Sequence, residues 1–230
     1  MAGSSKHPGP RSGAKLVVAI VVVMAIVAVT PVARADPPPT PGFRRAPVDL
    51  YGPAPTYECL RADPRRPGTE GFIAIVLAAY PNTVSGDAWA PCDSHSSTSL
   101  HHSGRAWDWV VAADNEIATP EVRAQVDELL RWLLAPEGTE PHARARRLGI
   151  VEIIWFDQLW TSGTRAWVPY PVFDCTDPAV SNTTCHRDHA HFTFSRSGAD
   201  AQTTWWLGWR GFTWSALDSV RGLFAAMLSL

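Results

Sequence analysis

The stretch DHAHFTFS, residues 188–195, alternates strictly between polar and apolar side chains from His189 to Ser195. Successive side chains of a β-strand point to opposite faces, so this pattern predicts a half-buried strand whose aromatic side chains face a core. His189 and His191 would lie on the polar face, about 7 Å apart, where both imidazoles can reach one small ligand. The stretch therefore places candidate chemistry on one face of a sheet.

Segments on either side of this strand have readable patterns of their own. Residues 120–134 begin after a threonine that suits a helix cap, with proline in the first turn, and they form one apolar helical face. Strands are expected at 106–111 and 150–156, and further helices at 142–148 and 215–230. The apolar run at 71–79 fits a buried strand or a helix. Together these segments predict an α+β domain with a small antiparallel sheet flanked by helices.

The N-terminus has the layout of a secretory signal. Basic residues precede an apolar run at 16–29, and Ala33-Arg34-Ala35 puts small residues where a signal peptidase reads them. We therefore expect residues 1–35 to be removed and the protein to be secreted or to reside in the cell envelope. The alternative is an uncleaved membrane anchor, but the 14 apolar residues are fewer than the roughly 20 that span a bilayer.

Composition divides the remaining chain. Residues 36–56 are rich in proline and predict an extended linker, 57–200 a folded domain, and 201–230 a tryptophan-rich helical extension. The first 35 residues contain four of the 20 Lys and Arg and none of the 22 Asp and Glu, so the exported chain is acidic. An acidic protein is poorly suited to nucleic acid or to an anionic membrane surface, so neither is expected as its partner.

Four cysteines, Cys59, Cys92, Cys175 and Cys185, all lie in the exported part. An even count in an oxidising compartment predicts two disulfides, for which three pairings are possible. The short, turn-rich segment between Cys175 and Cys185 favours a bond between these two, which leaves Cys59 with Cys92. The alternative use of the cysteines, as zinc ligands, would require thiolates that stay reduced outside the cell.

A second polar cluster precedes the strand at 106–111. His101 and Asp108 are seven residues apart and would face opposite sides of a single strand, but a turn at Ser103-Gly104 would let them converge. Catalytic zinc takes three protein ligands and keeps one position open. That count is fitted by His101, Asp108 and one histidine of the strand at 189–195. Spacing alone does not decide between His189 and His191. Isolated histidines are usually surface or core residues, yet five of the eight lie in two short segments.

The residues 99–108, SLHHSGRAWD, resemble the Ser-x-His-x-x-Gly-x-Ala-x-Asp signature of D-Ala-D-Ala carboxypeptidases. The HAH of 189–191 is similar to the His-x-His element of the wider superfamily, which includes lysostaphin-type endopeptidases and the hedgehog signalling domain. A closer resemblance, to secreted actinobacterial proteins of that superfamily, extends over 72–195 with its blocks in the same order.

This resemblance implies roles for individual residues. His101, Asp108 and His191 would be the zinc ligands, and His189 would steady the tetrahedral intermediate. The carboxypeptidases place a glutamate general base three residues before the last zinc ligand, where this chain has the shorter Asp188. Either Asp188 or His189 would then take the proton from the zinc-bound water.

Two residues of the same signature are candidates for substrate binding, Ser99 and Arg105. The guanidinium of Arg105 could hold a substrate carboxylate through two hydrogen bonds, and the alternative is an ordinary solvated arginine of a loop.

The expected function is a secreted zinc hydrolase that cleaves an amide bond in peptidoglycan peptides. One alternative is a zinc-containing cell-wall binding protein of the same fold with little or no activity. Another is a structural wall protein without a metal. The strand tryptophans suggest glycan stacking, but burial in the core is the favoured interpretation.

Overall fold

The computed structural model describes residues 37, 38, 40, 46–60, 64, 66–94 and 98–208. All of them belong to one compact unit, Arg34–Leu230. The expected signal peptide and the helix expected at 215–230 lie outside the described residues. Within the described part of the chain, no helix is long and apolar enough to cross a membrane.

Six antiparallel strands form one open sheet in the order β1-β2-β6-β3-β4-β5. Their bounds are β1 Val84–Ser85, β2 Ala106–Val110, β3 Ile150–Trp155, β4 Gln158–Thr161, β5 Trp167–Pro169 and β6 His189–Phe194. The strands predicted from alternation and from β-branched residues correspond to β2, β3 and β6. The predicted α+β class with an antiparallel sheet is confirmed.

The helices are α1 Pro67–Ala79, η1 Leu100–Ser103, α2 Pro120–Leu134, α3 Ala143–Leu148, α4 Arg196–Ala199 and α5 Thr204–Gly208, where η1 is a 3-10 helix. The α2 prediction is confirmed, including the Thr119 side chain that accepts a hydrogen bond from the Val122 backbone N–H. The apolar run at 71–79 is helical: it continues a helix that begins at Pro67, where proline suits the first turn.

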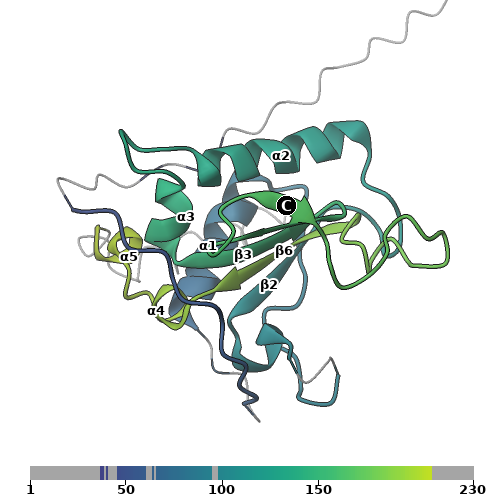
Figure 1. The fold of residues 1–230 in the computed structure, drawn as a ribbon, viewed down its shortest axis with the longest axis horizontal. Helices are drawn as coiled ribbons and strands as arrows, with labels where there is room; N and C mark the ends of the chain where they lie inside the picture. Colours follow the sequence, from purple (N-terminus) through teal and green to yellow (C-terminus); the bar gives the residue numbers. More distant parts are fainter. Residues whose placement is uncertain are drawn as a thin grey trace, which may run out of the picture. The chain divides into compact units, whose positions relative to one another are not determined.

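The core lies on one face of the sheet. Trp107 and Trp109 of β2 and Phe192 of β6 are fully buried there, and Phe72 of α1 packs edge-on against Trp107 and Phe192. Figure 1 shows β2, β6 and β3 side by side, with α1 behind them. The strand tryptophans are core residues, as the favoured interpretation predicted, and the opposite face of the central strands is free for polar side chains.

The proline-rich segment forms no helix or strand from residue 46 to 60, but it packs against the folded unit. Arg146 of α3 donates to the Asp49 carbonyl (2.7 Å), and Arg147 donates to the carbonyls of Ala46 and Pro47 (3.0 and 3.2 Å). Ala46, Pro47 and Asp49 therefore lie against α3 of the folded unit.

Two disulfides, Cys59–Cys92 and Cys175–Cys185, confirm the predicted pairing. Asp157 lies close to Cys175 and Cys185, but both sulfur atoms are used by the disulfide and are not available as thiolate ligands.

Candidate metal centre

Strand pairing brings Asp108 and His191 together. Asp108 of β2 lies directly opposite His191 of β6, on the face of the sheet that is turned away from Trp107 and Phe192. His101 reaches the same place from η1. Gly104 ends η1 in the left-handed region (φ 66°), and its N–H donates to the His101 carbonyl. The predicted turn at this glycine therefore returns the chain into β2 with His101 above Asp108.

Three side-chain atoms converge at this place. Asp108 Oδ1 lies 2.8 Å from His191 Nδ1, His101 Nε2 lies 3.3 Å from His191 Nδ1, and His101 Nε2 lies 3.5 Å from Asp108 Oδ1. A metal ion with tetrahedral nitrogen and oxygen ligands at 2.0–2.1 Å keeps those ligand atoms about 3.3–3.4 Å apart. The residues present therefore fit three corners of a tetrahedral metal site, and the expected convergence of His101, Asp108 and His191 is found.

Nε2 of His191 is held by a relay of two hydrogen bonds that runs through Thr193 to Glu152. Nε2 lies 3.1 Å from the Thr193 hydroxyl oxygen, and this hydroxyl donates to Glu152 Oε1 (3.1 Å). Because the hydroxyl proton is used towards Glu152, the oxygen accepts from His191 Nε2–H and so holds the ring with Nδ1 directed at Asp108. Partners of this kind orient histidine ligands of metal ions. Sequence reasoning missed Thr193 and Glu152, although a carboxylate inside the apolar strand IVEIIW was a signal.

The carboxyl group of Asp108 is held ionised. Burial alone would raise its pKa, but hydrogen bonds with His101 and His191 outweigh burial and hold the pKa well below its ordinary value. An ionised carboxylate that lies beside two imidazole nitrogens offers three ligand atoms to a cation.

Asp188 and His189 form a pair beside the three converging atoms. Asp188 Oδ1 lies 2.6 Å from His189 Nδ1, while Oδ2 accepts the Asn115 N–H (2.8 Å) and the Thr183 hydroxyl. Burial would raise the pKa of Asp188, but the hydrogen bonds from Thr183 and His189 keep it lowered. His189 Nε2 lies 3.9 Å from Asp108 Oδ1 and so faces the candidate centre. Asp188 therefore orients His189, and both of its oxygens are already occupied by donors.

The two candidate substrate-binding residues are directed elsewhere. Arg105 is 2% exposed, and its guanidinium donates to the Ser103 hydroxyl (3.1 Å) and to the Thr56 carbonyl. Arg105 lies two residues before Trp107, so its side chain points to the same side as Trp107 and away from the face that carries Asp108. Ser99 caps η1 by accepting from the His101 N–H (3.3 Å). Both side chains support the loop that carries His101, and the structure does not bring them to the converging atoms.

His186 is a further histidine beside the site. Its ring centroid lies 4.7 Å from that of His189 and 5.8 Å from that of His191. Burial, followed by the charges of His191 and His189, holds the pKa of His186 well below its ordinary value, so the ring is neutral. The sequence had shown it only as a member of a histidine cluster.

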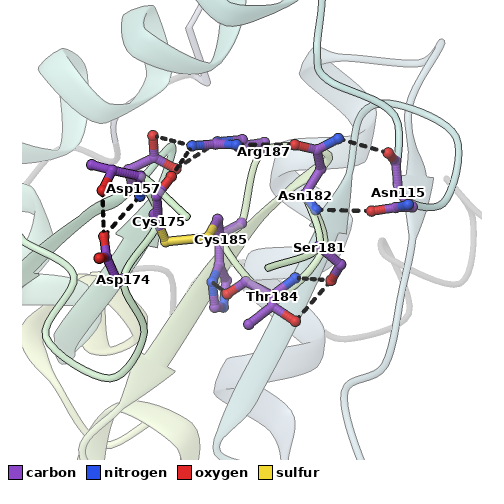
Figure 2. Close-up of a disulfide and its surroundings, with 11 residues drawn as sticks. Asn115, Asp157, Asp174, Cys175, Ser181, Asn182, Thr184, Cys185 and Arg187 are labelled. Atoms are coloured by element: carbon purple, nitrogen blue, oxygen red, sulfur yellow. Dashed lines mark hydrogen bonds and ion pairs between the residues drawn. A yellow bond between two sulfur atoms is a disulfide. The ribbon is translucent and has the colours of Figure 1, made fainter. Parts of the chain in front are cut away.

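The loop before β6 is braced on both sides. Figure 2 shows Arg187 between Asp157 and Asn182, next to the Cys175–Cys185 disulfide. Arg187 donates to both carboxylate oxygens of Asp157 (2.7 and 2.9 Å) and to the Cys175 carbonyl (2.6 Å). Asn182 accepts from Arg187 (3.1 Å) and contacts Asn115, the residue whose N–H binds Asp188. These contacts fix the segment from which His186, Asp188 and His189 project.

The fold and the site define an α+β protein with a candidate metal centre of two histidines and one aspartate. A family model described as VldE, C-terminal domain, matches residues 62–186, more than half of the chain. The chain belongs to this family. The matched region contains His101 and Asp108 and ends before His189 and His191. No curated protein and no solved structure matches the chain.

Proposed function

We propose that the protein is an exported zinc-dependent hydrolase that cleaves an amide bond in peptides of the cell wall. The observation that carries this proposal is the convergence of His101 Nε2, Asp108 Oδ1 and His191 Nδ1 at 2.8–3.5 Å, with His189 beside them. Two imidazoles and one carboxylate suit zinc, whereas magnesium and calcium prefer oxygen ligands alone.

Zinc held by these three residues would supply a Lewis acid that polarises a carbonyl and makes water acidic. The chain's own residues move the proton. His189 Nε2 faces the centre, and its Nδ1–H donates to the ionised Asp188, which stabilises the ring when Nε2 takes a proton from the attacking water. The same nitrogen then returns the proton to the leaving amine. In this role Asp188 is a positioning residue, and His189 is the base.

The substrate class follows from the resemblance to D-Ala-D-Ala carboxypeptidases and from the export signal. Two disulfides are consistent with an oxidising compartment outside the cytoplasm. Peptides that end in D-alanine are therefore the first substrates to assay.

One observation favours a second function, a zinc-containing wall-binding protein without turnover. The carboxylate at the position of the carboxypeptidase base has both oxygens occupied by His189, Asn115 and Thr183. If His189 cannot replace that base, binding would persist without hydrolysis.

Release of D-alanine from purified muropeptides separates the two functions. The hydrolase predicts release that stops on chelation and returns with zinc, and a loss of at least about 100-fold in His189→Gln at full zinc content. Binding to muropeptides with no release by the zinc-loaded parent would reject the hydrolase and favour the second function.

A further inference from the structure

His186 adjoins the candidate metal centre without belonging to it. The ligand atoms that lie within 4.8 Å of one another come from His101, Asp108 and His191, and His186 is not in this set. Its ring lies beside the His189 and His191 rings on one side and meets the Tyr170 ring edge-on, at a centroid distance of 5.1 Å, on another. The side chain therefore has a defined place at the border of the site.

The conformation of His186 is held on all sides. Its backbone is in the left-handed region (φ 54°), its carbonyl accepts the Phe156 N–H (2.9 Å), and the preceding Cys185 is tied by the disulfide. Nδ1 lies 3.1 Å from the Thr184 carbonyl oxygen, which can only accept, so Nδ1 carries the proton. Nε2 of the neutral ring is consequently an acceptor. No described residue donates a hydrogen bond to it, and the residue is partly exposed.

We propose that His186 is a substrate-binding residue whose Nε2 accepts a hydrogen bond from the N–H of the amide that is cleaved. This inference rests on the proposed function. A scissile amide offers a carbonyl oxygen and an N–H, and the carbonyl is polarised at the centre formed by His101, Asp108 and His191. The N–H needs an acceptor at the border of that centre, and His186 provides a fixed one.

Two other roles for His186 fit the geometry less well. A fourth metal ligand would have to join the set of close ligand atoms, and His186 is outside it. A proton-transfer role needs a partner that stabilises a charged ring. His189 has the carboxylate of Asp188, whereas His186 has only the carbonyl of Thr184.

The inference specifies the substrate class: peptide amides with a free N–H at the cleaved bond, in preference to esters of the same shape. A site that provides a hydrogen-bond partner for a substrate group rejects an analogue that lacks this group, because its own polar atom is then left unpaired. N-acetyl-D-alanyl-D-alanine and its ester analogue N-acetyl-D-alanyl-D-lactate differ in this N–H.

Two variants test the role of His186 Nε2 directly. His186→Asn keeps a group near Nδ1 and tolerates the left-handed backbone, but it has nothing at Nε2. His186→Gln reaches the position of Nε2 with an amide oxygen that can accept. His142→Asn is the matched control, because His142 has the same φ of 54° and lies outside the centre, with its ring against Trp160.

The measurement is the amide-to-ester ratio for the two probes, as kcat/KM where there is turnover and as Kd where there is none. We expect His186→Asn to lower this ratio about 10- to 100-fold at unchanged zinc content, with His186→Gln closer to the parent and His142→Asn equal to it. An unchanged ratio in His186→Asn, loss of zinc from it, or no binding of the amide probe by the parent would overturn the inference. Binding without turnover by the parent would instead reject the hydrolase, and the ratio of Kd values would still test His186.

Discussion

Thr193→Val tests whether the relay behind His191 prepares the metal site. Thr193 is fully buried, and its hydroxyl lies between His191 Nε2 and Glu152 Oε1, at 3.1 Å from each. Valine keeps the shape and removes both hydrogen bonds. His191 Nε2–H then has no acceptor at this position, and a buried unpaired donor costs about 1–3 kcal/mol, so the metal-free protein should lose stability by that amount.

Metal affinity should fall as well, for a separate reason. Without the relay, the ring of His191 is free to rotate, and Glu152 no longer increases the basicity of Nδ1. Loss of such a partner weakens metal binding about 10- to 100-fold, which corresponds to about 1.4–2.7 kcal/mol. The assay is competition for zinc with a chromophoric chelator, together with denaturant unfolding of the metal-free protein.

The matched control is Thr203→Val. Thr203 is also buried, at 5% exposure, and its hydroxyl has no hydrogen-bond partner among the described residues. It should change zinc affinity little. Equal zinc affinity in Thr193→Val and Thr203→Val would refute the reasoning that the relay orients His191.

Three further predictions concern the same site. Asp188→Asn should lower kcat at least about tenfold with zinc content unchanged, because His189 loses its ionised partner; equal kcat would contradict the assigned pair. Asp108 has a lowered pKa in the folded protein, so its contribution to stability is present above the unfolded pKa of about 3.9 and is lost as pH falls through the folded value. Acid unfolding of the metal-free protein should therefore depend less steeply on pH in Asp108→Asn than in the parent. Identical unfolding curves for the two proteins would contradict this contribution of Asp108. Replacing Cys175 and Cys185 by serine should lower the free energy of unfolding by about 3 kcal/mol and reduce activity, since the bond braces the segment that carries His189; a variant as stable and as active as the parent would exclude that role.

Local patterns in the sequence predicted the strand that carries the site. The alternation of 189–195 depends only on neighbouring residues, and β6 has the expected polar face with His189 and His191. The same reasoning could not predict that Asp108 lies opposite His191, because the register of two strands whose paired residues are 83 positions apart is set by tertiary packing. The resemblance to the carboxypeptidases supplied that grouping.

The neighbours of the site were harder to predict. Arg105 was assigned to substrate binding from its motif. Its position two residues before Trp107 already indicated that its side chain points to the face opposite Asp108. Asp188 is engaged by Asn115 and Thr183 from irregular segments, whose conformation has no periodicity that could be read in advance. The side chain of His186 is directed by its left-handed backbone and by the neighbouring disulfide. Neither feature can be predicted from the spacing of residues in the sequence.

Metal analysis of the purified protein tests the central claim most directly. The parent, His101→Ala, Asp108→Ala and His191→Ala would be loaded with zinc, freed of excess, checked for folding by circular dichroism, and analysed for zinc per chain. We expect about one zinc in the folded parent and little in each folded variant. A folded parent that holds no zinc after loading, or variants that retain it, would contradict the account.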